Sequence, residues 1–230
     1  MNFVRAALAA LVIAASPTTV SAQRLPSSAE IAAYTGFHAA AVKGDAEAIR
    51  ALAAKGAEVN ARDTRARTPL MVAAHFGKHE AAKALIAAGA DHAALDADRY
   101  DAVTVASVAN DPKMLRILLA AGASAALVTS PYNGTALIAS AHLGHAEVVR
   151  LLIAAKAPLD HVNNLGWTAL IESIVLGDGG TAHVACLKAL VDAGADVNIR
   201  DPNGTSPLGL ARARGYREMA AILEAAGAKP

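Results

Sequence analysis

The segment Gly204-Thr205-Ser206-Pro207-Leu208-Gly209-Leu210-Ala211 decides the fold, because its central part recurs along the chain. A residue suited to capping a helix is followed by a small residue or Pro and then by an apolar one. The copies are Thr35-Gly36-Phe37, Thr68-Pro69-Leu70, Asp101-Ala102-Val103, Thr135-Ala136-Leu137, Thr168-Ala169-Leu170 and Ser206-Pro207-Leu208. Their starts lie 33, 33, 34, 33 and 38 residues apart. A period of this length indicates a solenoid of stacked units.

Two further positions fix the register of the repeat. A Leu recurs about 17 residues after each start, and an Ala closes each unit. These residues are Leu52, Leu85, Leu118, Leu152, Leu190 and Leu223, and Ala57, Ala90, Ala123, Ala157, Ala195 and Ala228. Around them the apolar residues recur at helical spacing, as Val148, Leu151, Leu152 and Ala155 do. The sequence therefore predicts a pair of helices and a turn-rich connector in each unit.

Glycine marks the expected end of both helices. Helices commonly end on a left-handed residue, which Gly adopts without strain and Asn tolerates. The first helix of each unit is expected to stop at Gly44, Gly77, Asn110, Gly144, Gly177 and Gly215. The second is expected to stop at Gly56, Gly89, Gly122, Gly194 and Gly227. Lys156 takes the place of Gly in one copy, and we expect strain or a locally different turn there.

These segments resemble the ankyrin repeat, whose signature is Gly-x-Thr-Pro-Leu-His-x-Ala. The resemblance implies an all-α fold, an ankyrin-repeat solenoid of about six helix-turn-helix repeats with β-turn-like connectors. Only His38 occupies the motif His position, where the other copies carry Met71, Thr104, Ile138, Ile171 and Gly209. Since that His ties adjacent turns together in the family, we expect looser connectors. The third copy, which begins at Asp101, departs furthest and is the expected weak link.

The chain divides into three parts. Residues 1–22 have the anatomy of a cleavable signal peptide, with Arg5, an apolar run from Ala6 to Ala15 and small residues before a cleavage site after Ala22. Residues 23–34 form a linker and a short capping helix, because Ser27 and Glu30 have capping-box spacing. Residues 35–230 form the repeat domain, with repeat starts near 35, 68, 101, 135, 168 and 206.

The composition narrows the class of protein. The net charge is +1 and only 18% of the 230 residues are charged, which argues against a nucleic-acid surface. No segment after the signal peptide is apolar enough to span a membrane, so we expect no membrane insertion after cleavage. We therefore expect a periplasmic or secreted location. The single Cys, Cys186, falls at a core position and is expected to be buried and inert.

Few residues carry recognisable chemistry. His75 with His79, and His142 with His145, have the spacing of a metal pair. Each pair spans or adjoins a helix stop, and no third ligand follows, so we expect no metal. The Gly-rich insertion at Asp178-Gly179-Gly180-Thr181 lacks the Lys of a phosphate-binding loop. We expect no cofactor and no enzymatic activity, while the role of the insertion stays open.

The family resemblance implies that a partner binds the connector turns and the ends of the first helices. These positions hold Arg65, Arg67, His75, Phe76, Asp98, Tyr100, Tyr132, His142, Leu143, Leu165, Trp167, Val175 and Leu176. The chain has three Phe, four Tyr and one Trp, and four of these aromatics fall in this set. Aromatic residues and Arg are common interface anchors. We hypothesise that changing Tyr100, Tyr132 and Trp167 together weakens partner binding and spares helicity.

The function expected from these features is non-enzymatic binding or scaffolding of another exported protein, for instance an exported enzyme, by a monomer. Two alternatives stay open: binding of a small ligand or metal in the His-containing groove, and binding of host proteins by an exported effector.

Overall fold

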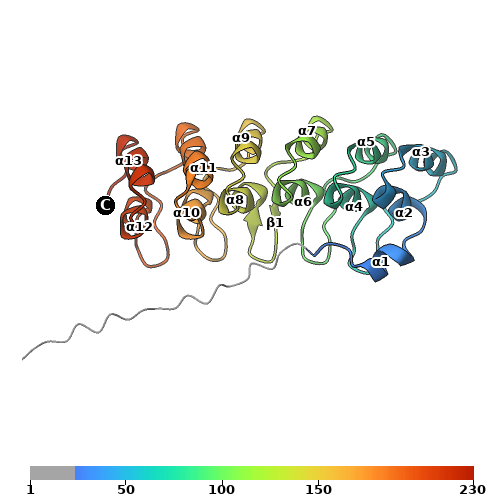
Figure 1. Cartoon of the computed structure of the whole chain (residues 1–230), viewed down its shortest axis with the longest axis horizontal. Helices are drawn as coiled ribbons and strands as arrows, with labels where there is room; N and C mark the ends of the chain where they lie inside the picture. The colour runs from blue at the N-terminus through green and yellow to red at the C-terminus, as the bar shows by residue number, and fades with distance from the viewer. Residues whose placement is uncertain (1–23) are drawn as a thin grey trace, which may run out of the picture.

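The computed structural model describes residues 24–230, so the predicted signal peptide lies outside the described residues. Within that range the protein is a row of six helix pairs, units one to six, preceded by a short helix (Figure 1). The first helices of the pairs form one row and the second helices form another, with the connectors on the far side of the first row. The predicted all-α solenoid is confirmed.

The helices are short and similar in length from unit to unit. The leading helix is α1 (Ser28–Ala33). The first row consists of α2 (Gly36–Lys43), α4 (Pro69–His75), α6 (Ala102–Val108), α8 (Ala136–His142), α10 (Ala169–Val175) and α12 (Pro207–Ala213). The second row consists of α3 (Ala46–Ala54), α5 (His79–Ala87), α7 (Pro112–Ala120), α9 (Ala146–Ala154), α11 (Thr181–Asp192) and α13 (Arg217–Ala225).

Every predicted repeat start is the residue that caps a first-row helix. In five units the side-chain oxygen of this residue accepts a hydrogen bond from the main-chain N–H three residues on. Such a bond satisfies one of the otherwise unpaired donors at a helix start. Asp101 caps α6 in this way, so the divergent third copy keeps the same architecture. Burial raises the pKa of the Asp101 carboxyl.

The predicted left-handed helix ends are confirmed at all but one position. Lys156 adopts φ +63°, so a residue with a Cβ takes the conformation that Gly takes in the other units. Gly177 is the exception: α10 ends at Val175, but the left-handed residue is Gly179, within the insertion. Gly177 is required for a different reason, because a Cβ there would lie 2.1 Å from the carbonyl oxygen of Ser173 and 2.8 Å from the ring of His183.

The connectors are narrow hairpin turns. The pairing in unit four is regular enough to form two short strands, β1 (Val128–Thr129) and β2 (Gly134–Thr135). They are antiparallel, with Val128 opposite Thr135 and Thr129 opposite Gly134. Within residues 24–230, β1 and β2 are the only strands.

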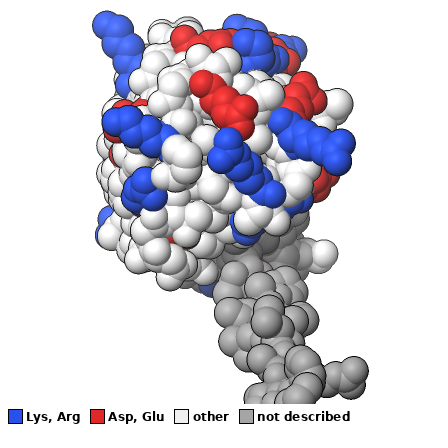
Figure 2. Space-filling view, turned by 90° about the vertical axis from the view of Figure 1, so that its left-hand side faces the viewer, with Lys and Arg blue, Asp and Glu red and all other residues white. Residues whose placement is uncertain are grey.

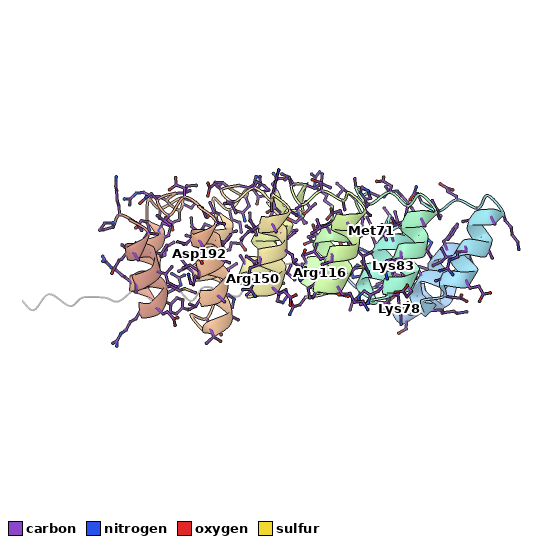
Figure 3. The ribbon with its side chains drawn as sticks, turned by 90° about the horizontal axis from the view of Figure 1, so that it is seen from above. Met71, Lys78, Lys83, Arg116, Arg150 and Asp192 are labelled. Atoms are coloured by element: carbon purple, nitrogen blue, oxygen red, sulfur yellow. The ribbon has the colours of Figure 1, made fainter. Side chains whose placement is uncertain are left out.

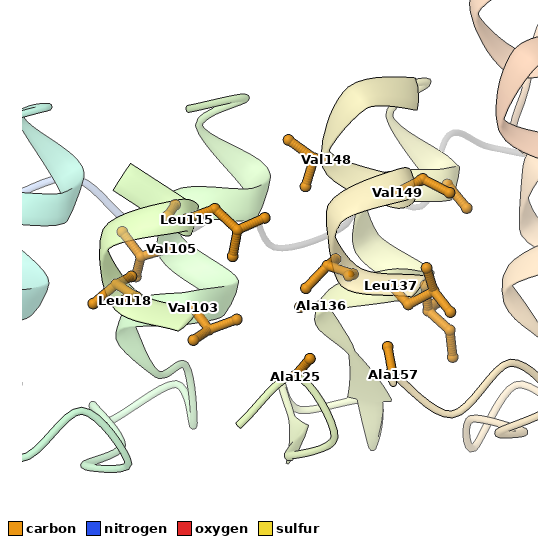
Figure 4. Close-up of a cluster of buried hydrophobic side chains, with 14 of the residues drawn as sticks. Val103, Val105, Leu115, Leu118, Ala125, Ala136, Leu137, Val148, Val149 and Ala157 are labelled. Carbon is orange, nitrogen blue, oxygen red and sulfur yellow. The ribbon is translucent and has the colours of Figure 1, made fainter. Parts of the chain in front are cut away.

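The core runs without interruption along the stack. Apolar side chains from both rows and from the connector bases interlock between neighbouring units, as Figure 4 shows around Val103, Leu118, Leu137 and Val149. The recurrent Leu is fully buried in units two to six and partly buried as Leu52 in unit one. Cys186 is buried as expected, and burial raises the pKa of its thiol to about 11.

The ends of the stack are closed differently. At the N-terminal end, Ser27 and Glu30 form the predicted capping box of α1, with main-chain to side-chain bonds of 2.8 and 3.2 Å. At the C-terminal end the exposed face of unit six carries Arg212, Arg214, Arg217 and Glu218. Figure 2 shows charged side chains of both signs spread over this end. A charged outer face is what a terminal repeat needs to stay in water.

Candidate protein-binding face

The connector turns share one construction. An Asp, Asn or Ser side-chain oxygen accepts hydrogen bonds from the main-chain N–H groups two and four residues further on, at 2.8–3.3 Å. The accepting residues are Asp63, Asp96, Ser130, Asn163 and Asp201. The residue three positions on is left-handed in each turn, so the chain reverses sharply. A short polar side chain that binds its own backbone is a common way to stabilise such turns.

Adjacent turns are tied to one another through the main chain. The N–H of Ala97 donates to the Arg65 carbonyl, and the N–H of Asn164 donates to the Tyr132 carbonyl, both at 2.9 Å. His38 ties the first two units as the family motif implies, with its Nε2 2.9 Å from the carbonyl oxygen of Arg67. In units two to six the motif His is missing, and these main-chain bonds join turns two to three and four to five. The N–H of Ser130 donates to the Arg99 carbonyl at 2.9 Å and joins turns three to four in the same way.

We use the term concave face for the surface formed by the turn tips and the C-terminal ends of the first-row helices. The structure places most of the predicted binding residues on it with partly exposed side chains. Two of the predicted residues are buried, contrary to the exposure expected of a binding residue. Arg67 is completely buried, because its guanidinium bonds to Asp63, Glu30 and the carbonyl oxygen of Arg24. Tyr100 is only 5% exposed.

Both side chains are buried for the same reason. Arg67 and Tyr100 lie on the returning arm of the turn, next to the helix cap, where a side chain packs against the neighbouring unit. Burial raises the pKa of the Tyr100 hydroxyl to about 12. Replacing Tyr100 would therefore disturb packing, and the triple change of Tyr100, Tyr132 and Trp167 does not separate binding from folding.

The exposed apolar residues gather in units four and five. Leu143, at the end of α8, and Leu165, at the tip of the unit-five turn, are each 42% exposed. Val128 and Val162, in the same two units, are 39% and 45% exposed. The other predicted residues of these units, Tyr132, His142, Trp167, Val175 and Leu176, are partly exposed. We call Tyr132, Leu143, Leu165, Trp167 and Leu176 the apolar patch.

The predicted residues of units two and three have a more polar character. Arg65 and Asp98 form an ion pair of 2.6 Å between neighbouring turn tips. His75 and Phe76 end α4 and are partly buried. Burial lowers the pKa of the His75 imidazole to about 4, and its Nε2 has no hydrogen-bond partner among the described residues. His75 is therefore neutral at physiological pH.

Sequence reasoning missed one residue beneath the apolar patch. Glu172, in the middle of α10, is 5% exposed and its Oε1 accepts a hydrogen bond of 2.7 Å from Asn163. Its Oε2 lies 3.3 Å from Nδ1 of His142, one of the predicted binding residues. The signal was present in the aligned repeats, because the other five units carry Ala39, Val72, Val105, Ala139 and Leu210 at this position.

The His pairs considered as metal ligands have other partners. His79 bonds to Asp111 at 2.7 Å, and His145 bonds to the carbonyl oxygen of Ser107 at 3.0 Å. Across residues 24–230, no three His, Cys, Asp or Glu side chains come together in a way that could hold a metal ion. In the insertion, Asp178 itself accepts the hydrogen bond of the Gly180 N–H at 2.8 Å.

The outer row of helices carries a line of basic side chains, in which Lys83, Arg116 and Arg150 stand on successive helices (Figure 3). Acidic residues are interleaved with them. Lys83 pairs with Glu80 at 2.8 Å, Arg116 pairs with Glu147 at 3.1 Å, and the next residue of the line, Lys188, pairs with Asp192 at 2.8 Å. This face therefore lacks the unbroken positive stripe that phosphate backbones select.

The chain belongs to the ankyrin-repeat family. A sequence profile of three ankyrin repeats matches residues 37–129 and 103–201. YahD of Escherichia coli (strain K12), named as an ankyrin repeat protein, is 40% identical over 98 residues, which are 42% of this chain and 49% of YahD. The chain thus spans about half the length of the curated relatives it matches.

Solved structures share the whole stack. An ankyrin repeat domain from Acinetobacter baumannii AYE is 43% identical, with a TM-score of 0.80, over 84% of this chain and 98% of that one. A chain from the complex of the predatory endopeptidase Bd0816 of Bdellovibrio bacteriovorus with immunity protein Bd3460 is 23% identical, with a TM-score of 0.70, over 84% and 98%. The second likeness shows the fold alone. The helices of residues 24–230 are all too short or too polar to cross a membrane.

Proposed function

We propose that this protein is a non-enzymatic binding module that holds another protein against its concave face, with the apolar patch as the main contact. Ankyrin repeats are protein-interaction modules, and the patch provides the chemistry such a contact needs. The observation that carries the proposal is the exposure of Leu143 and Leu165, the second of which shares with Trp167 a turn held by hydrogen bonds from Asn163. A rigid surface loses little conformational entropy when a partner docks.

The size of the expected contribution follows from the exposure. Fully burying a large apolar side chain contributes about 1.5–3 kcal/mol. Leu143 and Leu165 are each a little under half exposed, so each would contribute about 1 kcal/mol from area alone. Trp167 adds a large aromatic surface of the kind that dominates interface energetics. Truncation of the patch would therefore weaken binding by about tenfold or more.

The proposal includes export. Residues 1–22 would be removed as a signal peptide, and the mature chain would act in the periplasm or outside the cell as a monomer. The partner would then be another exported protein, with an exported enzyme as the specific candidate. The complex of an endopeptidase with an immunity protein, one chain of which shares this fold, makes this candidate concrete. N-terminal sequencing of the protein from fractionated cells tests export, with Gln23 as the expected first residue.

The binding experiment uses the mature chain, residues 23–230, as bait for exported proteins. Leu143→Ser combined with Leu165→Ser is the test variant. Leu25→Ser is the matched control, because Leu25 is 60% exposed but precedes α1, away from units four and five. A captured protein whose affinity falls at least tenfold with the double variant, and is unchanged with the control, supports the proposal. Equal affinity for all three baits contradicts it.

The two alternatives give different outcomes. Isothermal titration of the mature chain with Zn²⁺ tests metal binding, and the pairing of His79 with Asp111 and of His145 with Ser107 weighs against it. An effector of host proteins would be found outside the producing cell and would capture host proteins in the same experiment.

A further inference from the structure

A chain of five polar side chains runs beneath the apolar patch and reaches the insertion of unit five. We call Asn163, Glu172, His142, His183 and Asp178 the polar cluster. Asn163 holds the turn through the N–H groups of Leu165 and Trp167, at 3.0 and 3.1 Å. Glu172 holds Asn163, and it also lies against the ring of His142. The cluster therefore links the two parts of the patch that carry a leucine. These are the turn tip, with Leu165, and the end of α8, with Leu143.

The far end of the cluster is the contact between two units. Nε2 of His183, in α11, lies 2.9 Å from the carbonyl oxygen of His142, at the end of α8. Nδ1 of the same ring lies 2.8 Å from Oδ1 of Asp178, in the insertion. The side chain of His183 is only 14% exposed, whereas that of Asp178 is 79% exposed.

The two contacts of His183 can both be hydrogen bonds only when its ring carries two protons. A carbonyl oxygen can only accept a hydrogen bond, and so can an ionised carboxylate. Hydrogen bonds from the Gly180 N–H and from His183 hold the pKa of the Asp178 carboxyl below its usual range, which keeps it ionised. Both ring nitrogens are donors only in the doubly protonated imidazole, which carries a positive charge. A neutral ring can keep only one of the two contacts.

The glycines that flank Asp178 in the insertion pack closely against two rings, those of Tyr216 and His183. A Cβ on Gly179 would lie 2.4 Å from the ring of Tyr216, whose hydroxyl donates to the carbonyl oxygen of Gly177 at 2.9 Å. A Cβ on Gly177 would collide with His183 on the opposite side. The five extra residues of this unit thus fill a defined space between α11 and unit six.

We propose that the polar cluster is a protonation-dependent support of the apolar patch: the doubly protonated ring of His183 holds the end of α8 and the insertion in one conformation, and loss of one proton loosens the patch. Histidine is the side chain that ordinarily changes charge between about pH 5 and pH 8. Leu143, Leu165, Leu176 and Trp167 carry no ionisable group, so the cluster beneath them provides the pH dependence. The proposal rests on the proposed function only in treating the patch as the binding surface.

Other ionisable groups surround α11, and they differ from the cluster in their contacts. The elements packed on it are α8, α9, α10 and α13. Besides the cluster, these elements and their flanking turns carry His145, Glu147, Arg150, Arg214, Tyr216, Arg217, Glu218 and Glu224. His145 bonds to Ser107 and Arg214 approaches the carbonyl oxygen of Val175 at 3.4 Å. In the described structure, the two hydrogen bonds of His183 go to Asp178 and His142.

Trp167 is the single tryptophan of the chain, so its fluorescence reports on the patch without labelling. The experiment follows the emission and the acrylamide quenching of the mature protein from pH 6 to pH 8. We expect a red shift and stronger quenching at pH 8. Because Asp178 is largely exposed, losing its hydrogen bond to protonated His183 shifts an opening equilibrium by up to about fivefold. No change across this range would overturn the proposal.

Glu172→Val is the test variant, because Val72 and Val105 occupy the same position in units two and three. It keeps both histidines and breaks their link to Asn163, so we expect the pH response of Trp167 to disappear. A response that survives in Glu172→Val would come from direct quenching by an imidazole and would contradict the proposal. His161→Gln is the control, since His161 has the carbonyl oxygen of Asn133 as its partner, at 2.6 Å, and should leave the response intact.

Two further measurements keep the proposal testable if Glu172→Val does not fold. His183→Gln, which leaves Glu172 in place, should also remove the response. Nitrogen-15 NMR of the wild-type imidazoles should show both nitrogens of His183 protonated at pH 6, and a single protonated nitrogen would overturn the mechanism. Because none of these measurements needs a partner, their failure is distinguishable from failure of binding at the concave face.

Discussion

Replacing Arg67 by Met should destabilise the N-terminal end of the stack far more than the same change at Arg65. The Arg67 side chain is fully buried and bonds to Asp63, 2.7 Å away and 6% exposed, and to Glu30 of α1. The Arg65 side chain, two residues earlier, is 30% exposed and pairs with Asp98, which is 28% exposed. The two substitutions remove the same group from one turn and differ in burial.

The magnitudes follow from that difference. Removing one partner of a buried ion pair costs about 3–5 kcal/mol, because the other charge is left buried and uncompensated. An exposed pair contributes about 0.2–1 kcal/mol. Asp63 would keep its hydrogen bond of 2.6 Å from the Tyr34 hydroxyl but would lose its cation. We expect Arg67→Met to lower the free energy of unfolding by about 4 kcal/mol and Arg65→Met by less than about 1 kcal/mol.

The assay is urea unfolding followed by far-ultraviolet circular dichroism, with hydrogen exchange of the α1 amides as a local measure. With a denaturant dependence of about 2.5 kcal/mol per molar urea, the Arg67→Met midpoint should fall by about 1.5 M. Asp63→Asn added to Arg67→Met should recover part of the loss, because it removes the stranded charge and Asn163 occupies the same turn position in unit five. Equal midpoints for the two Arg variants, or no recovery, would refute the reasoning.

The same network predicts acid sensitivity. Burial works to raise the pKa of the Asp63 carboxyl, but hydrogen bonds from Tyr34 and Arg67 outweigh it and hold that pKa below its usual range. Main-chain and side-chain hydrogen bonds with Ser27 lower the pKa of Glu30. A carboxyl whose pKa is lower in the folded than in the unfolded protein stabilises the fold fully above its unfolded-state pKa. This stabilisation is lost as the pH falls below that value. Protection of the α1 amides should therefore decline below about pH 4.

The remaining predictions concern packing, turn strain and a buried imidazole. Leu118→Ala should cost about 3–4 kcal/mol in thermal or urea unfolding, and Leu52→Ala should cost clearly less because Leu52 is only partly buried. Lys156→Gly should raise stability by about 1 kcal/mol, since a residue with a Cβ is strained at φ +63°; an unchanged midpoint would mean the turn is relaxed. Burial lowers the pKa of His75 to about 4. The neutral imidazole therefore makes its full contribution to the free energy of unfolding above about pH 6.5, and that contribution falls progressively down to about pH 4. That loss should approach about 3 kcal/mol and be absent in His75→Val, as measured by urea unfolding at pH 7 and pH 4.5.

The repeat register could be read from the sequence because each of its signals is local. Thr68 and Asp101 cap helices through a bond to their own backbone three residues on, and Leu118 lies at the spacing of the inner face of a helix. Such features depend on neighbours within one unit, and the same unit recurs six times. The sequence predicted a left-handed residue at Gly177, whereas the structure has it at Gly179. The sequence could not show this difference, because the insertion is shaped by contacts with the rings of His183 and Tyr216.

Two of the predicted binding residues, Arg67 and Tyr100, are buried for a tertiary reason. The repeat position told which side chains lie at the turns, and the exposed Leu143 and Leu165 agree with it. A side chain at the base of a turn can face the partner or pack inward. Which of the two it does depends on the charged and hydrogen-bonding groups that neighbouring elements place near it. Arg67 can be buried because the carboxylates of Asp63 and Glu30 pair with its guanidinium.

By itself, the sequence determined the all-α class, the six units, their boundaries and the capping box of α1, because these follow from hydrogen bonds and apolar spacing within short segments. The tertiary structure alone decided that Arg67 is a buried clamp on α1 and that Glu172 meets both Asn163 and His142. It also decided that His183 bridges Asp178 and unit four. Those contacts join residues from different elements, and their energy depends on burial and distance, which only the stacked units fix.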